Sequence, residues 1–97
     1  MNYDEAKVKA ALIDGQKVVL FFHAAWCPTC RSLDSAINSD LTSIPQDTLI
    51  MKVDYDTSDT MKRKYGVTIQ HTTVLIDKNM EFVSKKLGAR TISEILE

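Results

Sequence analysis

Short blocks of hydrophobic residues along the chain predict four strands and four helices. Short continuous apolar runs predict buried strands, whereas apolar residues three or four positions apart predict helices. The predicted strands are residues 18–22, 48–56, 72–77 and 80–87. The predicted helices are residues 3–14, a segment beginning at Pro28, a short segment around Met61 and Tyr65, and a last one beginning at Thr91. The order α β α β α β β α predicts an α/β fold, with an early parallel βαβ unit, a late antiparallel hairpin and helices on both faces of the sheet.

The first predicted helix has one apolar face. This face consists of Tyr3, Ala6, Ala10 and Ile13. Asn2 is expected to cap the start of the helix, and Gly15 is expected to end it. We therefore expect these apolar residues to pack against the sheet.

Length, composition and charge narrow the class of protein. The 97 residues are 44% hydrophobic and 26% charged, which predicts a single soluble domain spanning residues 1–97. The net charge of −1 gives no support to nucleic-acid binding. The longest apolar run, residues 18–26, is too short to cross a membrane, and the polar start MNYDEAKVKA is unlike a signal peptide. We expect a cytoplasmic monomer, with an exported domain whose leader has been removed as the alternative.

The only two cysteines, Cys27 and Cys30, are separated by Pro28 and Thr29. Two cysteines form neither a multi-disulfide scaffold nor a four-cysteine zinc site within one chain. The pair is compatible with a redox couple, half of a metal site, a nucleophile with a bystander, or a structural pair.

The position of Cys27 favours the redox interpretation. Cys27 is expected at the N-cap of the helix that Pro28 begins, with Cys30 near the third helical position. The amides and the dipole at a helix N-terminus stabilise a thiolate, the species that attacks disulfides. Cys30, one turn further on the side of Leu33 and Ile37, is placed to attack a mixed disulfide at Cys27.

Several segments make the chain resemble the thioredoxin superfamily. They are VVLFFHAAW, WCPTC, KVDYD, KYGV and KKLGARTISEIL. The resemblance implies a thioredoxin fold, with a four-stranded mixed sheet because the usual first strand is missing. It also implies a redox-active disulfide between Cys27, the attacking thiol, and Cys30, the resolving thiol. The expected supporting residues are Trp26, Pro28, Thr29, His71 and Thr72.

Two positions depart from the family pattern. His71 stands before Thr72, where the family usually has a cis-proline, and Phe21 stands where thioredoxins proper have a buried aspartate. Without proline, the peptide bond between residues 70 and 71 is expected to be trans. His71 is either a buried histidine bonded to the backbone, a base or charge partner for Cys27, or a metal ligand.

The sequence therefore supports two hypotheses. The first is a thiol–disulfide oxidoreductase, leaning toward a reductase, which needs no cofactor. It would exchange with protein disulfide or dithiol substrates and with an upstream thiol reductant or oxidant. The alternative is a metal-binding module that holds zinc, copper or an iron–sulfur cluster through Cys27, Cys30 and His71.

Overall fold

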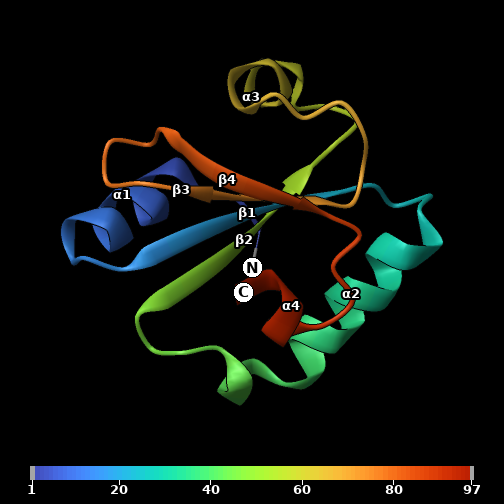
Figure 1. Ribbon diagram of the computed structural model, residues 1–97, viewed down its shortest axis with the longest axis horizontal. Coiled ribbons are helices and arrows are strands. Elements are labelled where there is room, and N and C mark those ends of the chain that lie inside the picture. The colour runs from blue at the N-terminus through green and yellow to red at the C-terminus, as the bar shows by residue number, and fades with distance from the viewer. Residues whose placement is uncertain (1, 97) are drawn as a thin grey trace.

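The computed structural model describes residues 2–96 and contains the predicted helices and strands in the predicted order (Figure 1). The helices are α1 (Glu5–Ile13), α2 (Pro28–Ser39), α3 (Asp59–Tyr65) and α4 (Ile92–Leu96), and a short 3₁₀ helix, η1 (Leu41–Ser43), follows α2. The strands are β1 (Lys17–His23), β2 (Thr48–Asp54), β3 (Thr72–Ile76) and β4 (Phe82–Leu87). None of the helices within residues 2–96 combines the length and the apolar character that crossing a membrane requires.

The strands form one mixed sheet in the order β2-β1-β3-β4. β1 is parallel to β2 and antiparallel to β3, and β3 and β4 form an antiparallel hairpin. Residues 18–22 of β1 are all buried, as expected for a central strand covered on both faces. The predicted four-stranded mixed sheet, with its parallel βαβ unit and its hairpin, is therefore confirmed.

The outer edge of β2 carries one short contact from the start of the chain. Asn2 forms an isolated parallel bridge with Lys52, and the Tyr3 amide donates to the Lys52 carbonyl at 2.8 Å. Among the described residues, this bridge is the only pairing on the free edge of β2, the edge at which a further strand would join the sheet.

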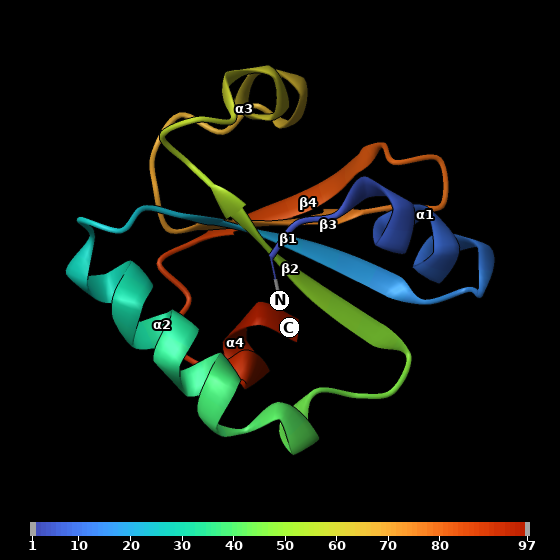
Figure 2. The same cartoon turned by 180° about the vertical axis from the view of Figure 1, so that it is seen from behind.

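Each face of the sheet supports its own hydrophobic cluster. α1 and α3 cover one face, where Leu20, Phe22 and Val74 pack with Leu12 and Tyr65. On the other face Phe21 and the buried side of α2 pack with Ile95 of α4. Figures 1 and 2 show α2 and α4 together on one side of the sheet and α3 on the other. The two cysteines belong to the cluster beneath α2.

The buried face predicted for the first helix was wrong. α1 buries Val8, Ala11 and Leu12, whereas Ile13 is 85% exposed. Both sets have helical spacing, and the sheet selects the set that contains the bulkier Val8 and Leu12. The predicted cap was also wrong, because Asp4 caps α1 and accepts hydrogen bonds from the Ala6 and Lys7 amides.

Three strands are shorter than predicted: β2 and β3 end earlier, at Asp54 and Ile76, and β4 begins later, at Phe82. β2 stops at Asp54, whose carboxylate accepts hydrogen bonds from the Asp56 amide and the Thr57 hydroxyl. β4 starts only at Phe82, since Met80 has a φ of 61° that a strand does not allow.

Candidate active site

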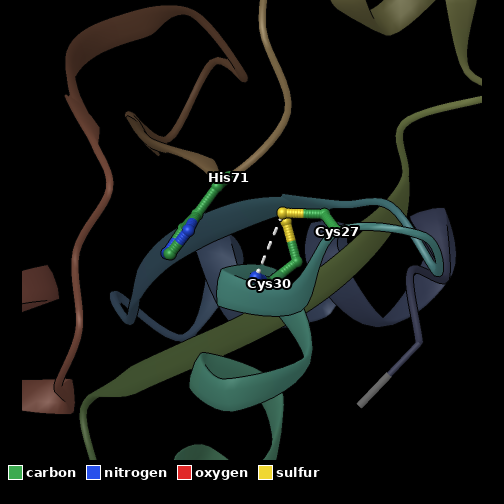
Figure 3. Close-up of side chains that lie close together, drawn as sticks. All are labelled: Cys27, Cys30 and His71. Atoms are coloured by element: carbon green, nitrogen blue, oxygen red, sulfur yellow. Dashed lines mark hydrogen bonds between the residues drawn. The ribbon is translucent and has the colours of Figure 1, made fainter.

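The turn between β1 and α2 places Cys27 at the helix N-cap, as the sequence predicted. Its backbone is extended, and its amide donates to the Ala24 carbonyl at 3.1 Å. Its sulfur accepts the Cys30 amide at 3.2 Å, drawn as the dashed line in Figure 3. Pro28 occupies the first turn of α2, where its missing N–H costs no hydrogen bond. The local sequence therefore directs the free amide of Cys30 toward the Cys27 sulfur.

Both cysteines are free thiols with little access to solvent. Cys27 is 2% exposed, and Cys30 is fully buried on the same face of α2 as Leu33 and Ile37. Cys27 is thus the thiol nearer to the surface, and Cys30 lies behind it.

The surroundings shift the two thiols in opposite directions. Burial of the Cys27 sulfur opposes ionisation, but hydrogen bonds from Cys30, Thr29 and Gln70 outweigh it and lower the Cys27 pKa from 9.0 to about 7. Burial, followed by the hydrogen bond with Cys27, raises the pKa of Cys30 to about 12. Near neutral pH one sulfur is therefore ready to attack while the other keeps its proton.

His71 lies beside the thiols, and both of its ring nitrogens are hydrogen-bonded. Nδ1 lies 2.8 Å from the Thr29 hydroxyl, which is 3.3 Å from the Cys27 sulfur. Nε2 lies 2.6 Å from the Ala89 carbonyl. Figure 3 shows His71 beside the two cysteines, on the segment before β3. His71 is therefore bonded to the backbone and also linked to Cys27 through Thr29.

The backbone of His71 is held in an uncommon conformation. Its φ is 60°, and no peptide bond within residues 2–96 is cis, so the bond before His71 is trans as expected. The His71 amide donates to the Phe22 carbonyl, and its own carbonyl accepts the Gly88 amide, both at 2.9 Å. These two bonds attach the loop before β3 to β1 on one side and to the residue after β4 on the other, and so orient the imidazole.

The three candidate metal ligands do come together. The sulfurs of Cys27 and Cys30 and a ring nitrogen of His71 lie within 4.8 Å of one another. A metal would need one imidazole nitrogen, but the nitrogens are already bonded to Thr29 and Ala89. The hydrogen bonds therefore favour the exchange chemistry, and we assign no metal to these residues.

Of the remaining supporting residues, Trp26 lies at the exposed rim of the site and Thr72 is buried in the loop that carries His71. Trp26 is 56% exposed beside Cys27, and its indole N–H donates to the Asp56 carboxylate at 3.0 and 3.1 Å. Thr72 is buried, and its hydroxyl donates to the Ile69 carbonyl at 2.8 Å, which closes the loop that carries His71.

Three groups of the site were missed by the sequence analysis. They are the Asp56 carboxylate, the Gln70 amide and the Ala89 carbonyl. Asp56 lies in the segment KVDYD, so the family resemblance could have indicated it. Nothing in the sequence marks the other two, because every residue has a carbonyl and loop glutamines are common.

Comparison with known proteins identifies the architecture independently. Residues 2–97 match the family model for thioredoxin. Thioredoxin H4 of Arabidopsis thaliana is 34% identical over 89 residues, which are 92% of this chain and 70% of that protein. The crystal structure of the germline-specific thioredoxin Deadhead from Drosophila melanogaster has a TM-score of 0.74 and 25% identity, covering 87% of this chain and 77% of that one. Trxlp from Edwardsiella tarda has a TM-score of 0.73 and 26% identity, covering 95% and 89%.

Proposed function

The chain belongs to the thioredoxin family and is a thiol–disulfide oxidoreductase, and on this premise we propose that it reduces protein disulfides with Cys27 as nucleophile. The observation that carries the proposal is the asymmetry of the pair. Cys27 has a pKa of about 7, while Cys30 beside it has a pKa raised to about 12. A nucleophile that ionises near ambient pH combines thiolate population with nucleophilicity.

The reaction has two exchange steps. The Cys27 thiolate attacks one sulfur of the substrate disulfide, the substrate S–S bond breaks, and the second substrate sulfur leaves as a thiolate. Cys30 then gives up its proton to that thiolate and attacks the Cys27 sulfur. The mixed disulfide breaks, the first substrate sulfur leaves as a thiolate that takes a proton from water, and the Cys27–Cys30 disulfide remains beside a reduced, dithiol substrate.

The rim of the site supports a protein as the substrate. Trp26 is 56% exposed and directly precedes Cys27 in the chain. Ile69 is 48% exposed and directly precedes Gln70, whose side chain bonds to the Cys27 sulfur. Exposed aromatic and aliphatic side chains around a buried reactive atom provide the apolar contact that a polypeptide substrate can cover.

We extend the proposal to the partners of the protein. An upstream thiol reductant returns the oxidised pair to the dithiol form, and a reducing compartment such as the cytoplasm supports that direction. We also propose that the enzyme acts as a monomer, because one chain supplies both thiols that the two exchange steps require. Size-exclusion chromatography and trapping of the cellular thiol state test these two points.

Insulin reduction with dithiothreitol as the electron source tests the proposed function. The wild-type protein is expected to speed precipitation of the insulin B chain, and Cys27→Ser is expected to abolish the effect. Cys30→Ser is expected to accumulate a mixed disulfide with the substrate. Equal trapping by both serine variants would contradict the assigned roles, and an equilibrium potential well above that of the glutathione pool would contradict the reductase direction.

A further inference from the structure

Four polar groups form a continuous hydrogen-bonded chain that ends at the reactive sulfur. The Cys27 sulfur lies 3.3 Å from the Thr29 hydroxyl, the hydroxyl lies 2.8 Å from Nδ1 of His71, and Nε2 lies 2.6 Å from the Ala89 carbonyl. A carbonyl can only accept, so Nε2 carries the hydrogen and Nδ1 of the neutral ring is an acceptor. Thr29 then donates to Nδ1, which leaves its oxygen free to accept the proton of the Cys27 thiol.

We propose that Thr29 relays the Cys27 proton to His71, so that the reactive thiolate forms together with an imidazolium. The S–H bond of Cys27 breaks as its proton moves to the Thr29 oxygen, and the Thr29 hydroxyl proton moves to Nδ1. One proton has moved and Thr29 is unchanged. The sulfur carries a negative charge and the ring a positive charge.

The relay leaves every group hydrogen-bonded in both states. After the transfer, Nδ1–H donates to the Thr29 oxygen and the Thr29 hydroxyl donates to the thiolate. This matters because His71 is 6% and Cys27 is 2% exposed, and a buried charge is stable only when it is paired and bonded. Thr29 touches the reacting sulfur, whereas His71 acts through Thr29 as a positioning residue and proton store.

The neighbours of the imidazole come from β1, from the start of α2 and from the segment after β4. α2 brings the thiols of Cys27 and Cys30, and β1 brings the uncharged ring of Phe21, which also contacts His23. Beyond Ala89, the charged residues are Arg90 and Glu94, and the Glu94 carboxylate is bonded to the Arg90 amide. Within residues 2–96, the groups hydrogen-bonded to the ring are Thr29 and Ala89, so a change of the His71 side chain reaches the Cys27 sulfur through Thr29.

A double-mutant cycle on the Cys27 titration tests the relay. Thr29→Val removes the hydroxyl at nearly constant shape, and His71→Asn removes the imidazole while asparagine tolerates the positive φ. Each is expected to raise the pH midpoint of Cys27 thiolate absorbance by about one pH unit, a tenfold change in ionisation constant. The double variant is expected to match the single ones, because either break interrupts the same chain.

Two matched controls accompany the cycle. Thr29→Ser keeps the hydroxyl and is expected to keep the wild-type midpoint, and His23→Asn removes the other histidine and should change nothing. Nitrogen NMR of His71 in wild-type protein at pH 7 is expected to show more protonated Nδ1 in the reduced than in the oxidised form, where Cys27 has no proton to give. Thr29 is exposed on α2, so the valine and serine variants remain informative if His71→Asn folds poorly.

The outcomes separate the relay from the proposed function on which its biological use rests. Midpoint shifts that add in the double variant, a serine variant that behaves like valine, or an unchanged NMR signal would each overturn the relay. If the wild-type protein still reduces insulin in that case, the proposed function stands without the relay. A coupled cycle in a protein that fails to reduce insulin would instead keep the relay and remove the function.

Discussion

Folding stability of the reduced protein should depend on pH through its two thiols. Cys27 has a pKa of about 7 in the fold, below its ordinary 9.0, because hydrogen bonds to the sulfur outweigh its burial. Folding therefore favours its thiolate, and this contribution is fully present above pH 9 and is lost as the pH falls through 7. Cys30, whose pKa burial raises to about 12, behaves in the opposite way. Its contribution is complete below pH 9 and is lost as the pH rises toward 12.

The two contributions combine to a maximum near pH 9. A depression of about two pKa units corresponds to about 2.7 kcal/mol once Cys27 is fully ionised in both states. Near pH 9, Cys30 is half ionised in the unfolded chain but still protonated in the fold. This difference favours unfolding and offsets part of the stabilisation from Cys27. Together the shifts predict that the free energy of unfolding rises by about 1 kcal/mol from pH 6 to pH 8 and by about 2 kcal/mol by pH 9, and then falls above pH 9.

Urea unfolding followed by circular dichroism, in excess phosphine reductant, measures this dependence. Cys27→Ser is the matched variant, because it keeps all other titrating groups. It should lose only the increase in the free energy of unfolding between pH 6 and pH 9. The oxidised wild-type protein should also lack both the rise and the fall. Parallel curves for reduced wild-type protein and Cys27→Ser between pH 6 and pH 9 would refute the stabilised thiolate.

Three further predictions concern packing, the rim and the loop. Leu12→Ala should lower the free energy of unfolding by about 2–5 kcal/mol, whereas Ile13→Ala should change it by less than about 0.5, and equal costs in urea unfolding would contradict the observed face of α1. Asp56→Ala should cost about 0.5–1.5 kcal/mol and shift the fluorescence of Trp26, the only tryptophan, so unchanged emission would count against the indole hydrogen bond. His71→Pro should be less stable than His71→Asn by about 3 kcal/mol or more, because proline lacks the N–H bonded to Phe22 and cannot adopt a φ of 60°. Equal melting of the two variants would show that this loop rearranges.

The fold was predictable where the hydrophobic pattern allows one answer. The run at residues 18–22 is too short for a helix and too apolar for an exposed strand, so its central place in the sheet follows. α1 is different, because a helix of nine residues rich in alanine offers two faces of helical spacing. Only the sheet distinguishes Val8 and Leu12 from Ile13, and the sheet is a tertiary feature.

The same distinction explains which parts of the site were predictable. The Cys27 cap depends on an amide three residues away, so the local sequence is sufficient. The bond between His71 and Thr29 joins residues 42 positions apart, and the bond to Ala89 spans 18. The sequence placed His71 near the thiols through the family resemblance, but it left open whether the ring would face sulfur, metal or backbone. That choice depends on distances that only the folded chain defines.

The two departures from the family pattern complement each other in the structure. Phe21 is 1% exposed, and its ring lies 5.8 Å from the imidazole, so the position expected to hold a buried carboxylate instead contributes to the apolar cluster under α2. Compared with the family pattern, β1 thus lacks an ionisable side chain at Phe21, and the loop before β3 has one at His71. On that loop Gln70 bonds to the Cys27 sulfur and Ile69 is exposed at the rim, so the proposed proton relay and the proposed substrate contact involve the same segment. A substrate that presses on this loop would therefore act directly on the hydrogen bonds that set the reactivity of Cys27.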